Sequence, residues 1–98
     1  MNDIEYTFEE VPVTMNGINY YADGTITVNF YSERGDSSVG YSGGIVISHY
    51  DRLAADLYDE DGNLAFSIHE EKGQIVDDIS KALNEYYVIA ECEEYLNG

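Results

Sequence analysis

The sequence holds few of the residues that mark redox, metal or membrane chemistry. Its single cysteine, Cys92, cannot form an internal disulfide, and it supplies neither a CxxC pair nor the ligand set of a structural zinc site. No apolar run approaches the roughly 18 to 20 residues that cross a bilayer, and residues 1–5 lack the basic and apolar regions of a signal peptide. We therefore expect no metal, no cofactor, no membrane contact and a cytoplasmic location.

Basic residues are also scarce. Four Lys and Arg stand against 20 Asp and Glu, so the formal net charge is −16, and Arg34, Arg52, Lys72 and Lys81 are isolated from one another along the chain. Proteins that bind DNA, RNA or anionic lipid directly need clustered basic side chains. The composition therefore disfavours direct nucleic-acid binding and favours a partner with a basic protein surface.

The apolar content is nevertheless that of a folded protein. Hydrophobic residues make up 44% of the 98 residues, and ten tyrosines are spread along the chain. Disordered chains combine high net charge with low hydrophobicity, which is not the case here. A chain of this length can bury one modest core, so we expect a single domain over residues 1–98.

The first two thirds of the chain alternate apolar and polar residues, which is the period of a strand with one buried face. Asn16-Gly17, Asp23-Gly24 and the acidic turn at residues 59–63 are typical of hairpin connections. Residues 53–58 also fit helical spacing, but the hairpin signal that follows them favours a strand. We expect strands at about 4–11, 17–22, 25–32, 44–50, 53–58 and 64–69.

The spacing of apolar residues changes to about 3.6 after Gly73 and predicts one helix over residues 74–96. On that helix Tyr86 matches an apolar position, whereas Cys92 falls at a flank or is partly exposed. The glycine- and serine-rich residues 33–44 predict a mobile loop that could contact a partner through Arg34 and Tyr41. The predicted fold is α+β: an antiparallel sheet of about five or six strands with one C-terminal helix packed on a face.

Catalytic and metal-binding signals are weak. His49 and His69 each have a carboxylate nearby in sequence, but no nucleophile motif and no third metal ligand accompanies them. The acidic turn at residues 59–63 resembles part of an EF-hand loop but has apolar residues at two of its ligand positions. We expect no enzyme activity, and the enzymatic alternative requires a cleft where at least two of His49, His69 and Cys92 converge.

The acidic residues are the strongest candidates for a binding surface. A compact domain of this size is roughly 33 Å across, and over that length duplex DNA carries about 20 charges, close to the net charge of this chain. Carboxylates recur along the predicted helix at intervals of about 9 to 12 Å, and tyrosines outside the apolar positions could act as desolvated anchors. The predicted partner-binding residues are Asp59, Glu60, Asp61, Asp77, Asp78, Glu85, Glu91, Glu94, Tyr21 and Tyr87.

Small size, extreme acidity, abundant tyrosine and a strand-rich chain closed by a helix together resemble the small acidic inhibitors of phages and mobile elements. These include anti-CRISPR proteins and DNA-mimic antirestriction proteins. The resemblance extends over the whole chain as composition and size, without a diagnostic motif. It implies a non-enzymatic inhibitor that acts in a bacterial host cell on a nucleic-acid-binding effector or nuclease, as a monomer or small homo-oligomer.

A second reading of the same composition stays open. The carboxylates can simply solvate a tyrosine-rich protein and keep it soluble. The chain would then be a structural, assembly or protein-interaction module, joined through an exposed strand edge or a tyrosine patch.

Overall fold

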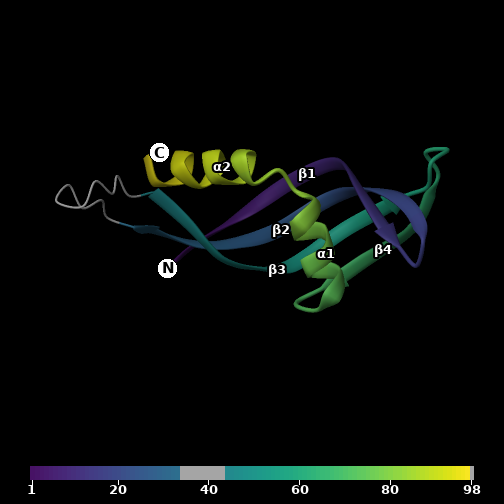
Figure 1. The fold of residues 1–98 in the computed structure, drawn as a ribbon, viewed down its shortest axis with the longest axis horizontal. Coiled ribbons are helices and arrows are strands. Elements are labelled where there is room, and N and C mark those ends of the chain that lie inside the picture. The colour runs from purple at the N-terminus through teal and green to yellow at the C-terminus, as the bar shows by residue number, and fades with distance from the viewer. Residues whose placement is uncertain (34–43, 98) are drawn as a thin grey trace.

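The computed structural model describes residues 1–33 and 44–97, which form four antiparallel strands and two helices (Figure 1). The elements are β1 (Asn2–Met15), β2 (Ile18–Glu33), β3 (Gly44–Tyr58), β4 (Leu64–Glu70), α1 (Gln74–Ala82) and α2 (Glu85–Asn97). The strands follow one another across the sheet in the order β1-β2-β3-β4. The α+β prediction is confirmed, whereas the expected five or six strands and single helix are wrong. Of the loop predicted over residues 33–44, Glu33 ends β2 and Gly44 begins β3, and the remainder, with Arg34 and Tyr41, lies outside the described residues.

Two of the three predicted turns are present. Asn16 and Gly17 join β1 to β2 with φ values of 53° and 78°. Positive φ at both central residues is the geometry of a type I′ hairpin turn, for which Asn-Gly is the preferred pair. Residues 59–63 join β3 to β4, and Gly62 supplies the positive φ there, at 85°. Local turn chemistry therefore determined both connections.

The third predicted turn, at Asp23-Gly24, does not exist. The expected strands at 17–22 and 25–32 are one continuous strand, β2, in which Gly24 lies opposite Phe8 of β1 and Ala55 of β3. A glycine inside a strand commonly marks a close backbone approach. A Cβ built at Gly24 would lie 2.1 Å from the Ala54 carbonyl oxygen, so the neighbouring strand explains this glycine.

A β-bulge likewise joins the expected strands at 44–50 and 53–58 into the single strand β3. Its register with β2 shifts between Thr25 and Thr27, and Arg52 takes a positive φ of 52° there. The Arg52 amide donates a hydrogen bond to the Glu71 carbonyl at 3.0 Å, beside the end of β4. Because a bulge adds one residue, the alternation of apolar and polar residues shifts by one position while the strand continues.

A second bulge lies in β1, which is longer than the predicted 4–11. The extra residue falls between Phe8 and Val11, where Glu10 has a φ of 51° and its amide donates to Asp23 Oδ1 at 2.7 Å. This bulge keeps Phe8 and Val13 on the same face although five positions separate them, and both are buried. Pro12 follows in this edge strand, where its missing donor is tolerated.

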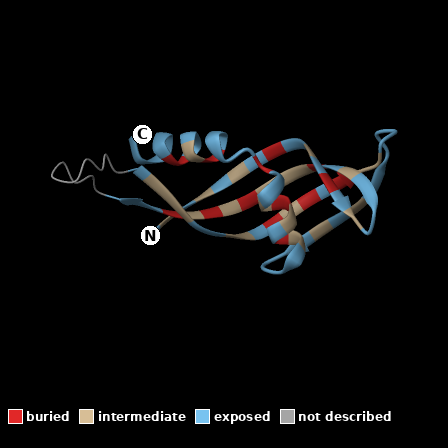
Figure 2. Cartoon of the chain, viewed as in Figure 1, coloured by how far each residue is buried: buried red, intermediate tan, exposed pale blue. Residues whose placement is uncertain are grey.

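The two helices cover one face of the sheet, and both contact β1 and β3 on either side of β2. Figure 1 shows α2 lying along the long axis of the molecule and α1 turned across it. Beneath them the side chains on alternate residues of β2 are fully buried, and Figure 2 shows the buried positions concentrated in this layer. The central strand contributes Ala22, Ile26, Val28 and Phe30 to the core. The other sheet face carries the polar row of each strand.

The helical region is broken at Leu83 and Asn84 rather than continuous over 74–96. Leu83 leaves the helix with an extended ψ of 149° and is itself buried. The Asn84 side chain then accepts a hydrogen bond from the Tyr86 amide at 3.0 Å, which is how an asparagine caps a helix N-terminus. The break resets the helical phase, so that Val88 and Cys92 are buried while Tyr86 is exposed. The predictions for Tyr86 and Cys92 are therefore wrong.

The described residues are elongated, extending over 53 × 23 × 21 Å with a radius of gyration of 15.5 Å. A compact chain of about 100 residues has a radius near 13 Å, so the diameter assumed from the sequence was too short. Duplex DNA as long as this molecule carries about 31 charges, which is roughly twice the net charge of the protein. No helix in residues 1–33 and 44–97 is long and apolar enough to cross a membrane.

Candidate functional site

The predicted partner-binding residues fall into two groups that lie in different parts of the molecule. Asp59, Glu60 and Asp61 lie in the turn between β3 and β4, and Tyr21 lies on β2 nearby. The others lie on the helices: Asp77 and Asp78 on α1, and Glu85, Tyr87, Glu91 and Glu94 on α2. Figure 1 shows the turn and α2 toward opposite ends of the long axis. The structure therefore does not gather these residues into one surface.

The turn group borders a hollow of about 490 Å³. Three strands and the turn contribute to its lining, which consists of Glu10, Tyr21, Asp23, Tyr58, Asp59, Glu60 and Gly62. Tyr21 and Tyr58 are direct cross-strand neighbours, so their rings start from adjacent positions on the polar face of the sheet. We call this feature the turn hollow. It combines two tyrosines with four carboxylates.

Hydrogen bonds within the protein fix the carboxylates of the turn hollow. Asp59 Oδ1 accepts from the amides of Asp61 and Asn63, each at 2.9 Å, which closes the turn. Glu60 Oε1 accepts from Asn19 Nδ2 at 3.3 Å across the strand end. Asp23 Oδ1 accepts from the Glu10 amide, as described above. These bonds hold three of the acids in place before any partner arrives.

Among the described residues, the four carboxylates of the turn hollow have no basic ion-pair partner to neutralise them. None forms an ion pair with a Lys, Arg or His side chain within residues 1–33 and 44–97. Like charges held in one hollow repel one another, and a cation placed among them would relieve that repulsion. Tyrosine rings attract the same cations through their faces. The arrangement is therefore chemically suited to an organic cation such as a guanidinium or ammonium group.

Three residues of the turn hollow, Glu10, Asp23 and Tyr58, were not predicted from the sequence. The sequence placed Asp23 in a turn that does not exist. In a continuous strand, residues two positions apart point to the same face, so Asp23 and Tyr21 lie on one face of β2. Glu10 enters the hollow because of the β1 bulge, and Tyr58 because of the register between β2 and β3. Both depend on pairing between distant segments. The local sequence carries no signal for either.

The helix group is more exposed and less organised. Tyr87 is 58% exposed and its ring meets that of Tyr86 edge to face, with centroids 5.6 Å apart. Gln74 Nε2 donates to Asp78 Oδ1 at 2.8 Å, within the same helix. Burial, reinforced by the charges of Glu91 and Tyr87, raises the pKa of Tyr6 on β1. Glu85 and Asp77 line two separate hollows beside β3, and within residues 1–33 and 44–97 no single hollow gathers the acids of this group.

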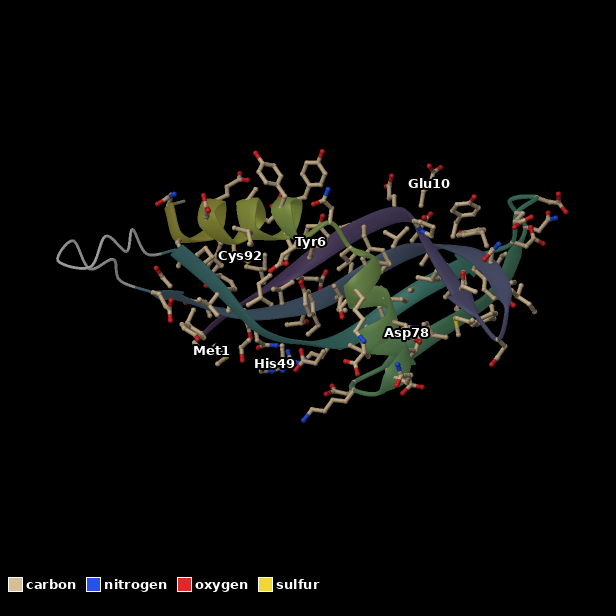
Figure 3. All side chains as sticks on the ribbon, viewed as in Figure 1. Met1, Tyr6, Glu10, His49, Asp78 and Cys92 are labelled. Carbon is tan, nitrogen blue, oxygen red and sulfur yellow. The ribbon has the colours of Figure 1, made fainter. Side chains whose placement is uncertain are left out.

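His49, His69 and Cys92 do not meet in any hollow formed by the described residues. His49 lies on β3 with Nε2 3.8 Å from Asp51 Oδ2, and it lines hollows toward α1. His69 lines a different hollow on β4 beside Glu70 and Glu71. Cys92 lies on α2 and is buried against the sheet (Figure 3). The cleft that the enzymatic alternative requires is not formed within residues 1–33 and 44–97.

Native Cys92 is expected to resist alkylation. Its side chain is 0% exposed, and burial, reinforced by the charges of Glu91 and Glu93, raises the pKa of the thiol. The thiolate is the reactive form, so iodoacetamide should modify the folded protein more than about tenfold more slowly than the unfolded protein. Mass spectrometry of timed samples, with and without urea, measures both rates. Equal rates would mean that α2 leaves the sheet readily.

No similar protein supports a functional assignment of this arrangement. Comparison with protein-family models, curated proteins and solved structures finds no match to this chain.

Proposed function

We propose that this protein is a non-enzymatic inhibitor that binds the basic nucleic-acid-binding site of a host defence complex in the bacterial cytoplasm. The proposed mode of action is that of anti-CRISPR or DNA-mimic antirestriction proteins, in which carboxylates take the place of phosphates. It needs no cofactor and no bond-breaking step. The observation that carries the proposal is the turn hollow, in which two tyrosines lie together with four carboxylates that form no ion pair with a basic side chain in the described part of the chain.

The charge per unit length supports this proposal in a revised form. Arg34 and Asp36 cancel, so the described residues carry the whole net charge of −16. Spread over the 53 Å long axis, this is one charge for about 3.3 Å, close to the 3.4 Å spacing of a single DNA strand. The protein is therefore comparable with one strand of a duplex. A partner that grips one backbone would meet a similar density of negative charge.

The turn hollow supplies the specific contact that net charge alone does not. Nucleic-acid-binding grooves are lined by Arg and Lys that contact phosphates. One such side chain entering the hollow would meet fixed carboxylate oxygens and the faces of Tyr21 and Tyr58. Charge-assisted hydrogen bonds and cation–π contacts are strongest where water is excluded. The hollow would then be the anchor, while the acids on α1 and α2 speed the approach of the partner.

The test uses candidate nucleases and effector complexes and compares two variants of equal charge. The first carries Asp23→Asn, Asp59→Asn and Glu60→Gln, which remove charge from the turn hollow but keep the hydrogen-bond acceptors. The second carries Asp77→Asn, Glu91→Gln and Glu94→Gln on the helices. We expect the first to weaken binding by more than about tenfold and the second by less than about threefold. Titration calorimetry across a salt series measures both.

The outcomes separate the alternatives. Wild-type affinity should fall steeply as salt rises, because the contact is ionic. An affinity indifferent to salt, or no binding to any basic partner, would contradict the proposal and favour a module whose acids only provide solubility. Equal losses in the two variants would show that total charge acts and that the turn hollow is not the anchor.

A further inference from the structure

Part of β3 has a free backbone edge. β3 pairs with β2 from Gly44 to Tyr58, with bulges at Ser48 and at Arg52, but β4 pairs only with residues 53–58. Apart from the Arg52 amide, which reaches the Glu71 carbonyl, no backbone group of residues 44–52 bonds to another described strand or loop on the outer side. Figure 1 shows this stretch at the margin of the sheet, with β4 covering only the other end of β3. We call residues 44–51 the free edge.

The free edge lacks the charges and the proline that usually protect an exposed strand, and its one irregularity is a β-bulge at Ser48, between His49 and Ile47. Natural edges carry charges or proline that prevent pairing with another chain. The opposite edge strand, β1, has both, with four carboxylates and Pro12 along its length. The free edge has the sequence Gly-Ile-Val-Ile-Ser-His-Tyr-Asp, in which the one acidic residue stands at the end. Ile45, Val46 and Ile47 are partly buried, and their backbone is open to pairing.

The charge around the free edge is more nearly balanced than elsewhere. Two hollows lie between it and α1, of about 310 and 490 Å³. Lys81 and Glu85 line the first, Lys72 and Asp77 line the second, and His49 lines both. Both lysines of the chain therefore lie at this end of the free edge, each with one carboxylate, and Asp51 of the edge itself lies beside His49. Two molecules of net charge −16 would meet the least repulsion here.

The opposite end of the free edge is acidic. Glu93 of α2 lines a hollow with Gly44 and Ile45, and no lysine lies there among the described residues. An antiparallel pairing of two identical segments places the beginning of one beside the end of the other. Lys72 and Lys81 of each copy would then face Glu93 of the other copy. The arrangement is self-complementary, and a strongly basic partner would gain nothing from the lysine end.

We propose that the free edge of β3 binds a second copy of this chain, forming an antiparallel strand pair and a continuous eight-stranded sheet. The two-fold axis passes near Ile47, the middle of the segment, and the α1 helices lie at the two ends. Each pairing supplies backbone hydrogen bonds to amides and carbonyls that otherwise bond to water. The interface is small, and the charge of the two copies opposes it, so the dimer is weak at low salt.

The test is the mass of the purified full chain in solution, measured by sedimentation equilibrium over a concentration series at low and high salt. We expect the association constant of the dimer to rise by more than about tenfold from low to high salt, because screening weakens the repulsion between the two copies. The affinity for a basic partner should instead fall as the salt concentration rises. The two proposals can therefore fail independently.

Two matched variants locate the interface. Ser48→Asp adds a charge beside the two-fold axis, and Thr7→Asp adds the same charge to the exposed face of β1. We expect the first to lower the dimerisation constant by more than about tenfold beyond the second, because like charges across a strand pair repel. Urea midpoints verify that both variants fold. A monomer at every concentration and salt level, or equal effects of the two substitutions, would overturn the proposal.

Discussion

Replacing Gly24 with alanine is expected to lower the free energy of unfolding by about 3 kcal/mol or more. The added Cβ would lie 2.1 Å from the Ala54 carbonyl oxygen and 2.7 Å from Ala55 Cα. Both are backbone atoms of β3, so relief requires β2 and β3 to separate where the sheet is widest. A domain of this size has about 5 to 15 kcal/mol of stability in total. Urea unfolding followed by circular dichroism measures the change.

Gly17→Ala is the matched control for this substitution. Gly17 has a φ of 78° and nothing within 4 Å of an added Cβ, so alanine there costs only the strain of a left-handed backbone, about 1 to 2 kcal/mol. Gly24 differs because its neighbours, and not its φ, exclude a side chain. Equal urea midpoints for the two variants would show that β3 does not approach Gly24 as described, and would restore the turn predicted from Asp23-Gly24.

Replacing Ile26 with alanine is expected to cost about 2 to 5 kcal/mol. Ile26 is 0% exposed and lies in the core beneath the helices, directly opposite the β3 bulge. Its removal loses buried apolar surface and leaves a cavity that the close-packed sheet and helices cannot fill completely. The same urea titration measures this loss.

Ile18→Ala provides the comparison on the same strand and the same face. Ile18 is 53% exposed, beyond the region that α1 and α2 cover. Its truncation should cost less than about 1 kcal/mol. If the two isoleucines gave equal losses, the helices would not define the core as the structure places them. A difference of the expected size would establish that the core ends before the β1–β2 turn.

The parts of the fold that depend on local chemistry could be predicted from the sequence. Asn16-Gly17 and Gly62 favour positive φ by themselves, so both hairpin turns were placed correctly. The change of period after Gly73 likewise located the helical region. Asn84 is a favourable helix cap, but asparagine can also occur within a helix, so the sequence alone did not indicate a break. The structure shows the break because Leu83 is extended and buried just before the Asn84 cap.

The strand count could not be predicted because long-range pairing overrides local signals. Asp-Gly is typical of a turn, and only the approach of Ala54 on the next strand shows that Gly24 stays extended. The phase change near Arg52 looks like the end of a strand, although a bulge produces the same pattern. Strand register is set by which residues become buried together, and this is a property of the whole sheet.

The candidate site divides in the same way. Asp59 and Glu60 could be predicted, because they belong to a turn that forms locally. Tyr21 was predicted as an exposed ring, and it is 44% exposed. Its neighbour Tyr58 comes from a strand 37 positions later, through a register that no local pattern encodes. The acids on α2 were predicted from their spacing along a helix, but the helix break and the length of the sheet place them far from the turn hollow.

The elongated shape has a consequence for how the protein behaves in motion. A body more than twice as long as it is wide meets more friction than a sphere of equal volume, and it tumbles more slowly about its short axes. A single copy should therefore leave a gel-filtration column ahead of globular standards of its 11.0 kDa mass, as a compact dimer would. Sedimentation equilibrium, which measures mass, will distinguish one copy from two. Gel filtration depends on the hydrodynamic radius, so the elution volume will reflect the length of the molecule.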